Sequence, residues 1–397
     1  MRSLFILLCA IIIVSCSSKI EYIQRCSTAT EIISIGEDEI IDDDLVQNAD
    51  FIFLDNTYII GEIGRMIFFD NRIFIHDNIA DRIIVFTYGG NYLFHIDSKG
   101  RGPNEYLEIA DFAVDKQSSS ILIYDSKGHK ILTYSINNRK FTTEQVIDFY
   151  PTKIACVKDQ LYFYNPYTFN YPKNNKYHFS LISTSKNVKI RAKYFIVNTK
   201  IGNFLSNPNT QGFFYGDEIT FLNRFESIIY KIDEDSVYAS CMVDFFGNEN
   251  FEKALLNAVD KGTRNTDLFN QYSTEITNYC ETDKLIAFQY TRNELLYYVV
   301  YSKEDKNLLY HSSFLKLYSE SLLIKNIPFF IIPQMSHENM FISILPSQLV
   351  ESFVNNPKFN SEIKKNMSDE LLISRFEDVK KDDNPILVMY SFNEKIN

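Results

Sequence analysis

Residues 73–96 contain Ile73-Phe74-Ile75-His76-Asp77, then Arg82-Ile83-Ile84-Val85-Phe86, then Tyr92-Leu93-Phe94-His95-Ile96, with Tyr88-Gly89-Gly90-Asn91 before the last run. Short β-branched and aromatic runs separated by turn residues are typical of antiparallel strands, and Gly89-Gly90 suits a tight hairpin turn. The stretch therefore predicts a small antiparallel sheet.

The same pattern of strands and turns recurs in the next part of the chain. Ile121-Leu122-Ile123-Tyr124-Asp125 leads to Lys130-Ile131-Leu132-Thr133-Tyr134 and an Asn137-Asn138 turn. In both units a strand ending in Asp precedes a strand that opens with a basic residue and Ile. Asp77 and Asp125 are 48 residues apart, within the spacing of roughly 40–50 residues that propeller blades show.

Four looser clusters of the same kind follow, which makes six in all. They cover 160–164 with 177–182, 218–222 with 227–232, 285–288 with 295–301, and 329–332 with 340–344. Such sheets can bury both faces only by stacking on their neighbours. We therefore expect an all-β fold, a six-bladed β-propeller.

Short helical insertions interrupt the β pattern. Apolar residues recur at helical spacing over 251–259, up to Gly262, and over 349–354, and Ser368-Asp369-Glu370 is placed to cap a third helix through Phe376. We expect these helices at one rim of the propeller. Insertions can form lids over a site, but an apolar helical stripe more often serves packing.

The last strong strand pattern is Pro385-Ile386-Leu387-Val388-Met389-Tyr390. In closed propellers a terminal strand completes a blade begun at the other end of the chain. We therefore expect residues within 28–60 and 385–392 to share the last blade.

One loop stands out, Gly100-Arg101-Gly102-Pro103-Asn104-Glu105-Tyr106, followed by Ile109-Ala110-Asp111-Phe112. Its glycines and proline suit a tight crossing between blades. The structural part of this region is expected to be Gly100, Gly102, Pro103 and Asp111. The candidate ligand-binding residues are Arg101, Glu105 and Tyr106. Arg101 and Glu105 could instead pair with each other or tie blades together, and this structural role is the favoured interpretation.

This loop resembles the G-x-G-P-G-E-Y loop and following I-x-D-F strand of six-bladed β-propeller lipoproteins, NHL-like proteins abundant in Gram-negative gut commensals. The closing stretch 383–388 resembles the C-terminal strand of that family. Asn104 replaces the usual glycine, a tolerable exchange because Asn also enters left-handed conformations. The resemblance implies the architecture, and it transfers no activity because the family has none established.

The N-terminus predicts export and a lipid anchor. Arg2 precedes a short apolar run, and Ile13-Val14-Ser15-Cys16 resembles the bacterial lipobox. The run is too short to span a bilayer, which takes roughly 20 residues. We expect a signal peptide over 1–15, lipid attachment at Cys16, an N-terminal tether with a possible first strand over 16–49, and the propeller over 50–397. An ordinary signal peptide with an incidental cysteine is the alternative.

The residue after Cys16 is Ser17. It lacks the Asp that typically retains lipoproteins at the inner membrane, so outer-membrane delivery is favoured. The periplasmic face and the cell surface both remain open as the side on which the protein is displayed.

The net charge restricts the possible partners, and the cysteines restrict the possible disulfide and metal sites. The net charge of −11 becomes −12 after loss of residues 1–15, which argues against nucleic acid because phosphate binding depends on Lys and Arg. Cys26, Cys156, Cys241 and Cys280 could form disulfides in an oxidising compartment, with three possible pairings, or stay as buried thiols. Their spacing does not suggest zinc.

No recognised catalytic motif is present. The chain has no Trp, its six His are dispersed, and it has no G-x-S-x-G elbow or phosphate loop. We therefore expect neither cofactor nor metal. The favoured hypothesis is a non-catalytic, membrane-tethered binding or scaffold protein with a glycan or protein ligand.

The alternative is a polysaccharide hydrolase or lyase that uses acids in the propeller funnel. It predicts a deep central pocket with at least two converging carboxyl groups of raised pKa. A funnel lined by apolar or small residues would argue against it.

Overall fold

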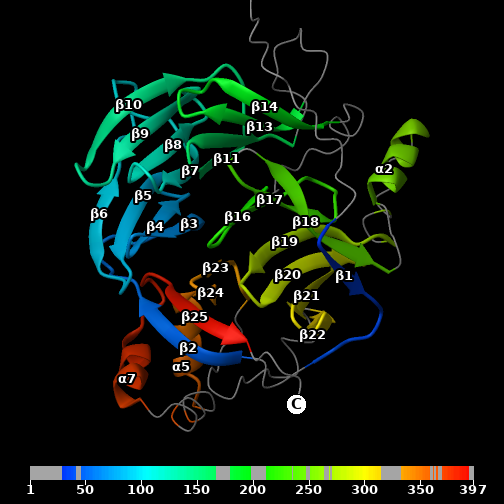
Figure 1. The fold of residues 1–397 in the computed structure, drawn as a ribbon. Helices are drawn as coiled ribbons and strands as arrows, with labels where there is room; N and C mark the ends of the chain where they lie inside the picture. The colour runs from blue at the N-terminus through cyan, green and yellow to red at the C-terminus, as the bar shows by residue number, and fades with distance from the viewer. Residues whose placement is uncertain are drawn as a thin grey trace, which may run out of the picture.

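Six antiparallel sheets are arranged as blades around a central axis, and each sheet contacts its two neighbours (Figure 1). The computed structural model describes residues 29–41, 46–166, 179–197, 212–234, 236–246, 251–262, 268, 271–313, 332–357, 361, 364 and 369–392. The predicted six-bladed β-propeller is confirmed.

The first three blades follow one another along the chain, and each is a meander of four strands. From the axis outward, the first blade consists of β3 (Ile63–Phe69), β4 (Arg72–Asp77), β5 (Arg82–Thr87) and β6 (Tyr92–Ile96). The second consists of β7 (Ile109–Asp115), β8 (Ser120–Asp125), β9 (Lys130–Ser135) and β10 (Lys140–Val146). The third consists of β11 (Lys153–Val157), β12 (Gln160–Tyr164), β13 (Phe179–Ser185) and β14 (Ile190–Ile196).

Of the other three blades, the fourth and the sixth include a strand from the N-terminal part of the chain, and the fifth is a single meander. The fourth consists of β15 (Phe213–Tyr215), β16 (Ile219–Leu222), β17 (Ile228–Ile232), β18 (Val237–Phe245) and β1 (Glu31–Ile35). The fifth consists of β19 (Thr274–Glu281), β20 (Leu285–Arg292), β21 (Leu295–Ser302) and β22 (Asn307–Ser313). The sixth consists of β23 (Met335–His337), β24 (Met340–Leu345), β25 (Ile386–Phe392) and β2 (Val46–Phe53).

The two chain ends close the ring. β2 pairs antiparallel with β25, with Phe51 opposite Val388, so the prediction that both ends share the last blade is confirmed. β1 adds in parallel to β18, the outer strand of the fourth blade. Between them, Ile40 exchanges two backbone hydrogen bonds of 2.7 and 2.8 Å with His311 of the fifth blade. The N-terminal segment thus pairs with the outer edges of the fourth and fifth blades and forms the outer strand of the sixth.

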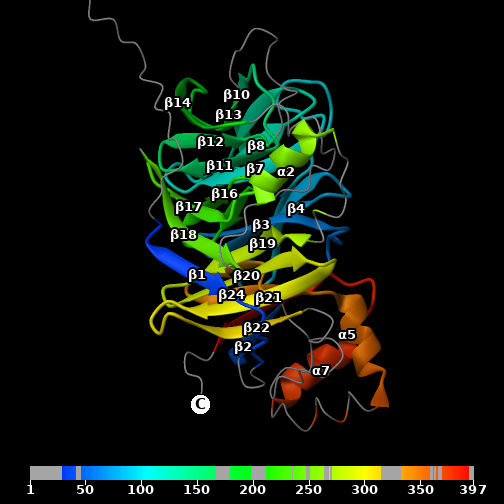
Figure 2. The same cartoon turned by 90° about the vertical axis from the view of Figure 1, so that its right-hand side faces the viewer.

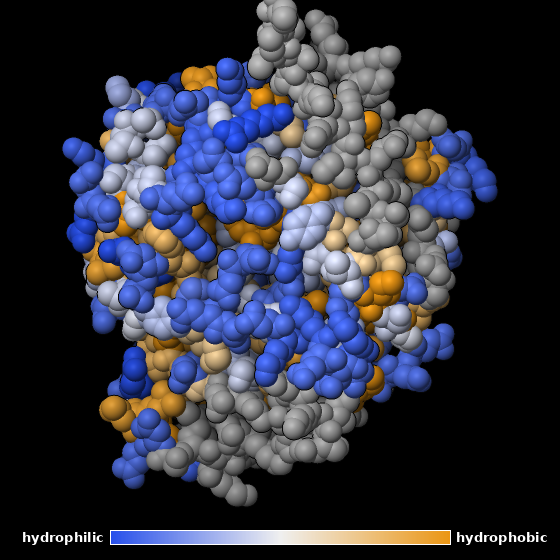
Figure 3. All heavy atoms as spheres, in the orientation of Figure 1, coloured by the Kyte–Doolittle hydropathy of each residue, from blue (hydrophilic) through white to orange (hydrophobic). Residues whose placement is uncertain are grey.

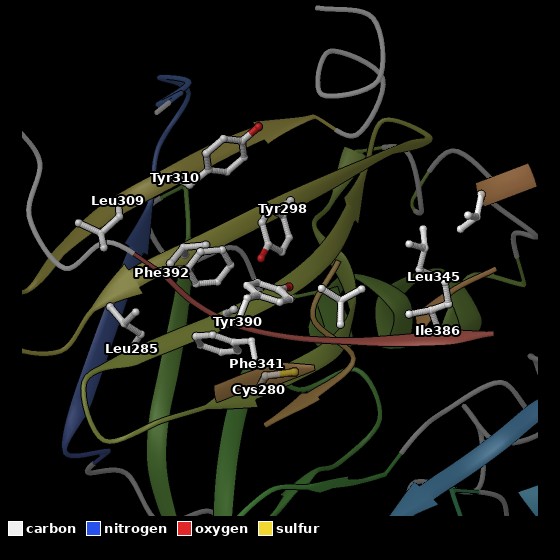
Figure 4. Packing of buried hydrophobic residues seen from close by; sticks show 14 of the residues in the cluster. Cys280, Leu285, Tyr298, Leu309, Tyr310, Phe341, Leu345, Ile386, Tyr390 and Phe392 are labelled. Carbon is white, nitrogen blue, oxygen red and sulfur yellow. The ribbon is translucent and has the colours of Figure 1, made fainter. Parts of the chain in front are cut away.

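The core lies between the blades because each sheet presents apolar side chains on both faces. Between the fifth and sixth blades, Tyr298, Phe341, Tyr390 and Phe392 point toward one another (Figure 4). The rings of Phe341 and Phe392 have centroids 4.8 Å apart. The Tyr390 hydroxyl is also satisfied, at 2.9 Å from the Ser343 hydroxyl. Tyr390 therefore adds buried apolar area without leaving its own hydroxyl unpaired.

The three predicted helical insertions are present: α2 (Phe251–Asp260), α5 (Ser347–Val354) and α7 (Glu370–Asp378). Asp369 caps α7, since its carboxylate accepts a hydrogen bond from the Leu372 N–H. α5 and α7 lie together beside the sixth blade, away from α2 (Figure 2). No helix in the described ranges is both long and apolar enough to span a bilayer.

Phe376 of α7 packs on the outer strand of the sixth blade. Its ring is fully buried, with its centroid 5.0 Å from that of Phe51 and 5.3 Å from that of Phe53. This helix therefore covers the strand that closes the ring. The strand predicted over 329–332 lies outside the described residues except for its last position, and β23 is the inner strand of this blade.

Candidate axial binding site

The loop 100–106 joins β6 to β7, and Tyr106 anchors it. The Tyr106 side chain is fully buried, and its hydroxyl donates to the Asp81 carbonyl at 2.9 Å. The Gly100 N–H donates to the Tyr106 carbonyl at 2.9 Å, and the Tyr106 N–H donates to that of Ser98 at 3.0 Å. The hydroxyl, N–H and carbonyl of Tyr106 are thus all hydrogen-bonded within the region that joins the first two blades.

Glu105 folds back onto the same loop. Its carboxylate accepts a 2.6 Å hydrogen bond from the Gly102 N–H. A Cβ at Gly100 would lie 2.0 Å from a Glu105 carboxylate oxygen, so a larger residue there would displace this carboxylate. Asn104 has a φ of 61°, the left-handed conformation that glycine or asparagine can supply. Arg101 and Pro103 are exposed, and none of these loop residues lines either cavity described next.

A cavity of about 190 Å³ lies on the propeller axis, and we call it the axial cavity. Its wall comes from β3, β11, β15 and β19 and from residues at β23 and β24, so the inner strands of five blades contribute to it. On the face seen in Figure 1, hydrophilic side chains form a band across the middle of the molecule (Figure 3). The surroundings of the axis on that face are therefore polar.

Arg65 and Asp111 form a buried ion pair beside the axial cavity. The Arg65 Nε lies 2.7 Å from the Asp111 Oδ1, and the two side chains are 8% and 1% exposed. The other Asp111 oxygen accepts a 2.7 Å hydrogen bond from the Ile154 N–H. The Arg65 guanidinium carbon lies 4.3 Å from the centre of the Tyr215 ring, a cation–π contact. The Tyr215 hydroxyl donates to the Ile154 carbonyl at 2.6 Å.

This cluster joins β3, β7, β11 and β15, so it holds four blades at the axis. Asp111, which the sequence placed with the crossing loop, belongs to it. Arg65 and Asp111 take part in its packing and its charge, but only Arg65 reaches the cavity wall.

Lys153, at the start of β11, is the second cation of the wall. It is partly buried, and its ammonium group has no hydrogen-bond or ion-pair partner within the described ranges. Its pKa is lowered: Asp111 raises the pKa, but burial and the Arg65 charge together lower it more. His76 lies near Arg65 and Asp111, and its pKa is lowered mainly by burial.

A second cavity, of about 300 Å³, is lined by residues of the fourth, fifth and sixth blades, and we call it the inter-blade cavity. Glu281, the last residue of β19, lies 2.7 Å from the Lys303 Nζ and 3.3 Å from the Lys231 Nζ through Oε1. Its other oxygen accepts a 3.0 Å hydrogen bond from the Tyr279 hydroxyl. Burial raises the pKa of Glu281, but Lys303 and Lys231 outweigh it, so the pKa is lowered.

A carboxyl group with a lowered pKa is ionised at neutral pH and is a poor general acid. The other carboxylates in the described wall of the inter-blade cavity are all exposed: Asp217, Glu218 and Asp283. The described walls therefore hold no converging pair of buried acids. Among the described side chains, no group of three His, Cys, Asp or Glu is arranged to hold a metal ion.

Three cysteines are buried free thiols, Cys156, Cys241 and Cys280. Burial raises the pKa of Cys156 to about 12 and also raises the pKa values of Cys241 and Cys280. Cys16 and Cys26 lie outside the described residues, as does the predicted signal peptide.

Sequence reasoning did not find Arg65, Lys153, Tyr215 or Glu281. Each lies on the inner strand of its blade, where the side chains line the two cavities. An alignment of the six repeats would have shown which residues lie on the innermost strands. Only the first two repeats are similar enough in sequence to be aligned.

The chain is similar to two solved structures of Bacteroides proteins. A candidate exported protein from Bacteroides fragilis NCTC 9343 is similar at a TM-score of 0.70 and 19% identity, over 91% of this chain and 99% of that chain. A DUF4221 family member from Bacteroides vulgatus is similar at a TM-score of 0.46 and 10% identity, over 89% of this chain and 99% of that one. No curated protein matches the chain in sequence.

The match to a family model covers nearly the whole described chain. Residues 31–391 match the model described as Domain of unknown function (DUF4934). This confirms the resemblance to a propeller family without an established function, drawn from the loop 100–106. The chain belongs to the DUF4934 family.

Proposed function

We propose that the protein is an exported, lipid-anchored propeller that binds a ligand in the axial cavity and does not catalyse a reaction. The observation that carries the proposal is the composition of the wall. Its described charged side chains are two cations, Arg65 and Lys153, and most of the rest are apolar. A hydrolase or lyase of the kind considered above needs acids there, whereas a binding site does not.

Export and anchoring are supported by the N-terminal sequence. Arg2, the apolar run and Cys16 form the lipoprotein signal. The similar Bacteroides fragilis structure is also described as a candidate for export. We propose attachment to the outer membrane through the Cys16 lipid, with the propeller at the periplasmic face or the cell surface.

The anchor is tested by expressing the full chain with Cys16→Ala and following membrane fractionation and labelled-lipid incorporation. The unchanged protein should partition with membranes and carry label, and Cys16→Ala should lose both. Cys26→Ala is the matched control and should behave like the unchanged chain. Label on the Cys16→Ala protein would exclude attachment at this residue.

Binding without catalysis is tested with the mature chain and a panel of glycans and peptides. Calorimetry should detect binding to at least one panel member, and chromatography should detect no new product on long incubation. Turnover that disappears in Glu281→Gln would support the hydrolase or lyase alternative and overturn the proposal.

A further inference from the structure

We infer that the axial cavity binds a small organic monocarboxylate, with the Lys153 ammonium as its ionic contact. This inference rests on the proposed function and names the ligand class of that site. It is argued from charge, from the free donors of the two cations, and from the size and apolarity of the wall.

The charge around the cavity has the opposite sign to that of the molecule. The whole chain carries −11, yet the described cavity wall has Arg65 and Lys153 and no carboxylate. Asp111, just behind the wall, compensates one of the two positive charges. One net positive charge remains over these three groups, and an uncompensated, partly buried charge is costly. An anion of charge −1 would balance it.

The donors favour a carboxylate over a phosphate. The Arg65 Nε is held by Asp111, an Nη donates weakly to the Ile154 carbonyl at 3.5 Å, and the guanidinium plane lies over Tyr215. Arg65 is therefore poorly placed to offer the bidentate fork that phosphate recognition uses. Lys153 offers a compact point charge with no other partner in the described chain, which suits one carboxylate.

The wall also sets the size and the apolar character of the ligand. A cavity of about 190 Å³ has room for roughly six waters, at about 30 Å³ each. Its apolar side is formed by buried side chains, namely Met66, Phe213, Phe214 and Met335. A carboxylate attached to a short aliphatic chain or to a single ring matches both the volume and the wall.

The inference is tested by calorimetry on the mature chain with benzoate, and with benzamide as the neutral isostere. Benzoate should bind, and benzamide should bind at least about 10-fold more weakly, because a charged hydrogen bond in a partly buried site is lost. Lys153→Met should lower benzoate affinity by about 10-fold or more, and Lys153→Arg should restore part of it.

Lys158→Met is the matched control, since Lys158 lies one residue beyond the same strand, is exposed, and pairs with Asp233 and Glu234. It should leave benzoate affinity unchanged. Thermal unfolding of each variant checks that the fold is retained.

Equal binding of benzoate and benzamide, equal binding by Lys153→Met and the unchanged chain, or preference for inorganic phosphate would each overturn the inference. The proposed function fails by a different result, turnover of a panel member. A propeller that binds a neutral glycan in this cavity without turnover would therefore refute the carboxylate assignment and leave the binding role standing.

Discussion

Asp77 and Asp125, 48 residues apart, occupy equivalent positions at the ends of β4 and β8 and are both fully buried. Each carboxylate accepts backbone hydrogen bonds from the crossing before its blade and from the turn after its own strand. The donors are Gly61, Glu62, Ile79 and Ala80 for Asp77, and Leu107, Glu108 and Gly128 for Asp125. In the first two blades this aspartate thus joins the crossing before the blade to the turn after its own strand.

Replacing Asp125 by Ala should destabilise the protein by about 3 kcal/mol, because several backbone N–H groups lose their acceptor in a buried place. Urea unfolding followed by circular dichroism measures this change. Asp125→Asn should cost less, since its amide oxygen still accepts. Asp97→Ala, at an exposed carboxylate, should change the free energy of unfolding by less than about 0.5 kcal/mol. Equal effects of Asp125→Ala and Asp97→Ala would contradict the fastening role.

The same aspartates explain why the fold could be predicted. Their spacing marks one blade, and the local period of strands and turns marks the others, so the blade count follows from information within each repeat. Asn165 stands at the corresponding end of β12, and its amide donates to the Tyr150 carbonyl at 2.7 Å. The repeat therefore changes its residue type after two blades, which hides its regularity in sequence.

The axial cluster could not be predicted, because its members meet only when the ring closes. Arg65, Asp111, Lys153 and Tyr215 come from four blades, and each is one residue of an ordinary strand pattern. The parallel pairing of β1 with β18 is of the same kind. A strand pattern specifies which face is buried, but it does not specify which distant edge the strand joins.

The helix over the closing strand should matter for stability through one side chain. Phe376→Ala should destabilise the protein by about 3–4 kcal/mol, because it leaves a cavity against Phe51 and Phe53. Leu371→Ala on the same helix is the control, since Leu371 is 73% exposed. It should change the free energy of unfolding by less than about 0.5 kcal/mol. A small effect of Phe376→Ala would mean that α7 is dispensable for ring closure.

Glu281 should contribute an acid-dependent part of the stability. Its pKa is lower in the folded protein than in the unfolded chain, where it is about 4.3. The stabilisation is therefore complete above that pH and is lost as the pH falls through the folded pKa. The difference in unfolding free energy between the unchanged chain and Glu281→Gln should be constant from pH 5.5 to 7 and shrink below about pH 4.

The measurement is urea unfolding across that pH range, with Glu304→Gln as control at an exposed position. Lys303→Met should weaken the pH dependence, because Lys303 makes the shorter of the two lysine contacts to Glu281. A difference that grows as the pH falls would show that the pKa of Glu281 is raised instead.

The three buried thiols should react slowly with alkylating reagents in the native protein. In the chain from Ser17 onward with Cys26→Ser, the remaining cysteines are Cys156, Cys241 and Cys280. Burial raises the pKa of Cys156 to about 12, so almost none of its side chain is a thiolate at pH 8, against about a quarter of an ordinary thiol. Burial also excludes the reagent. Alkylation by iodoacetamide should therefore be at least about 1,000-fold slower in the native protein than in denaturant.

Mass spectrometry after denaturation without reductant should then find all three thiols alkylated. Fewer than three would reveal a disulfide and contradict the free-thiol arrangement. Fast alkylation under native conditions would instead show that the blades open locally around these strands, because a thiolate must reach solvent to react. The site of any fast reaction, read from the peptide that carries the label, would identify which pair of blades separates.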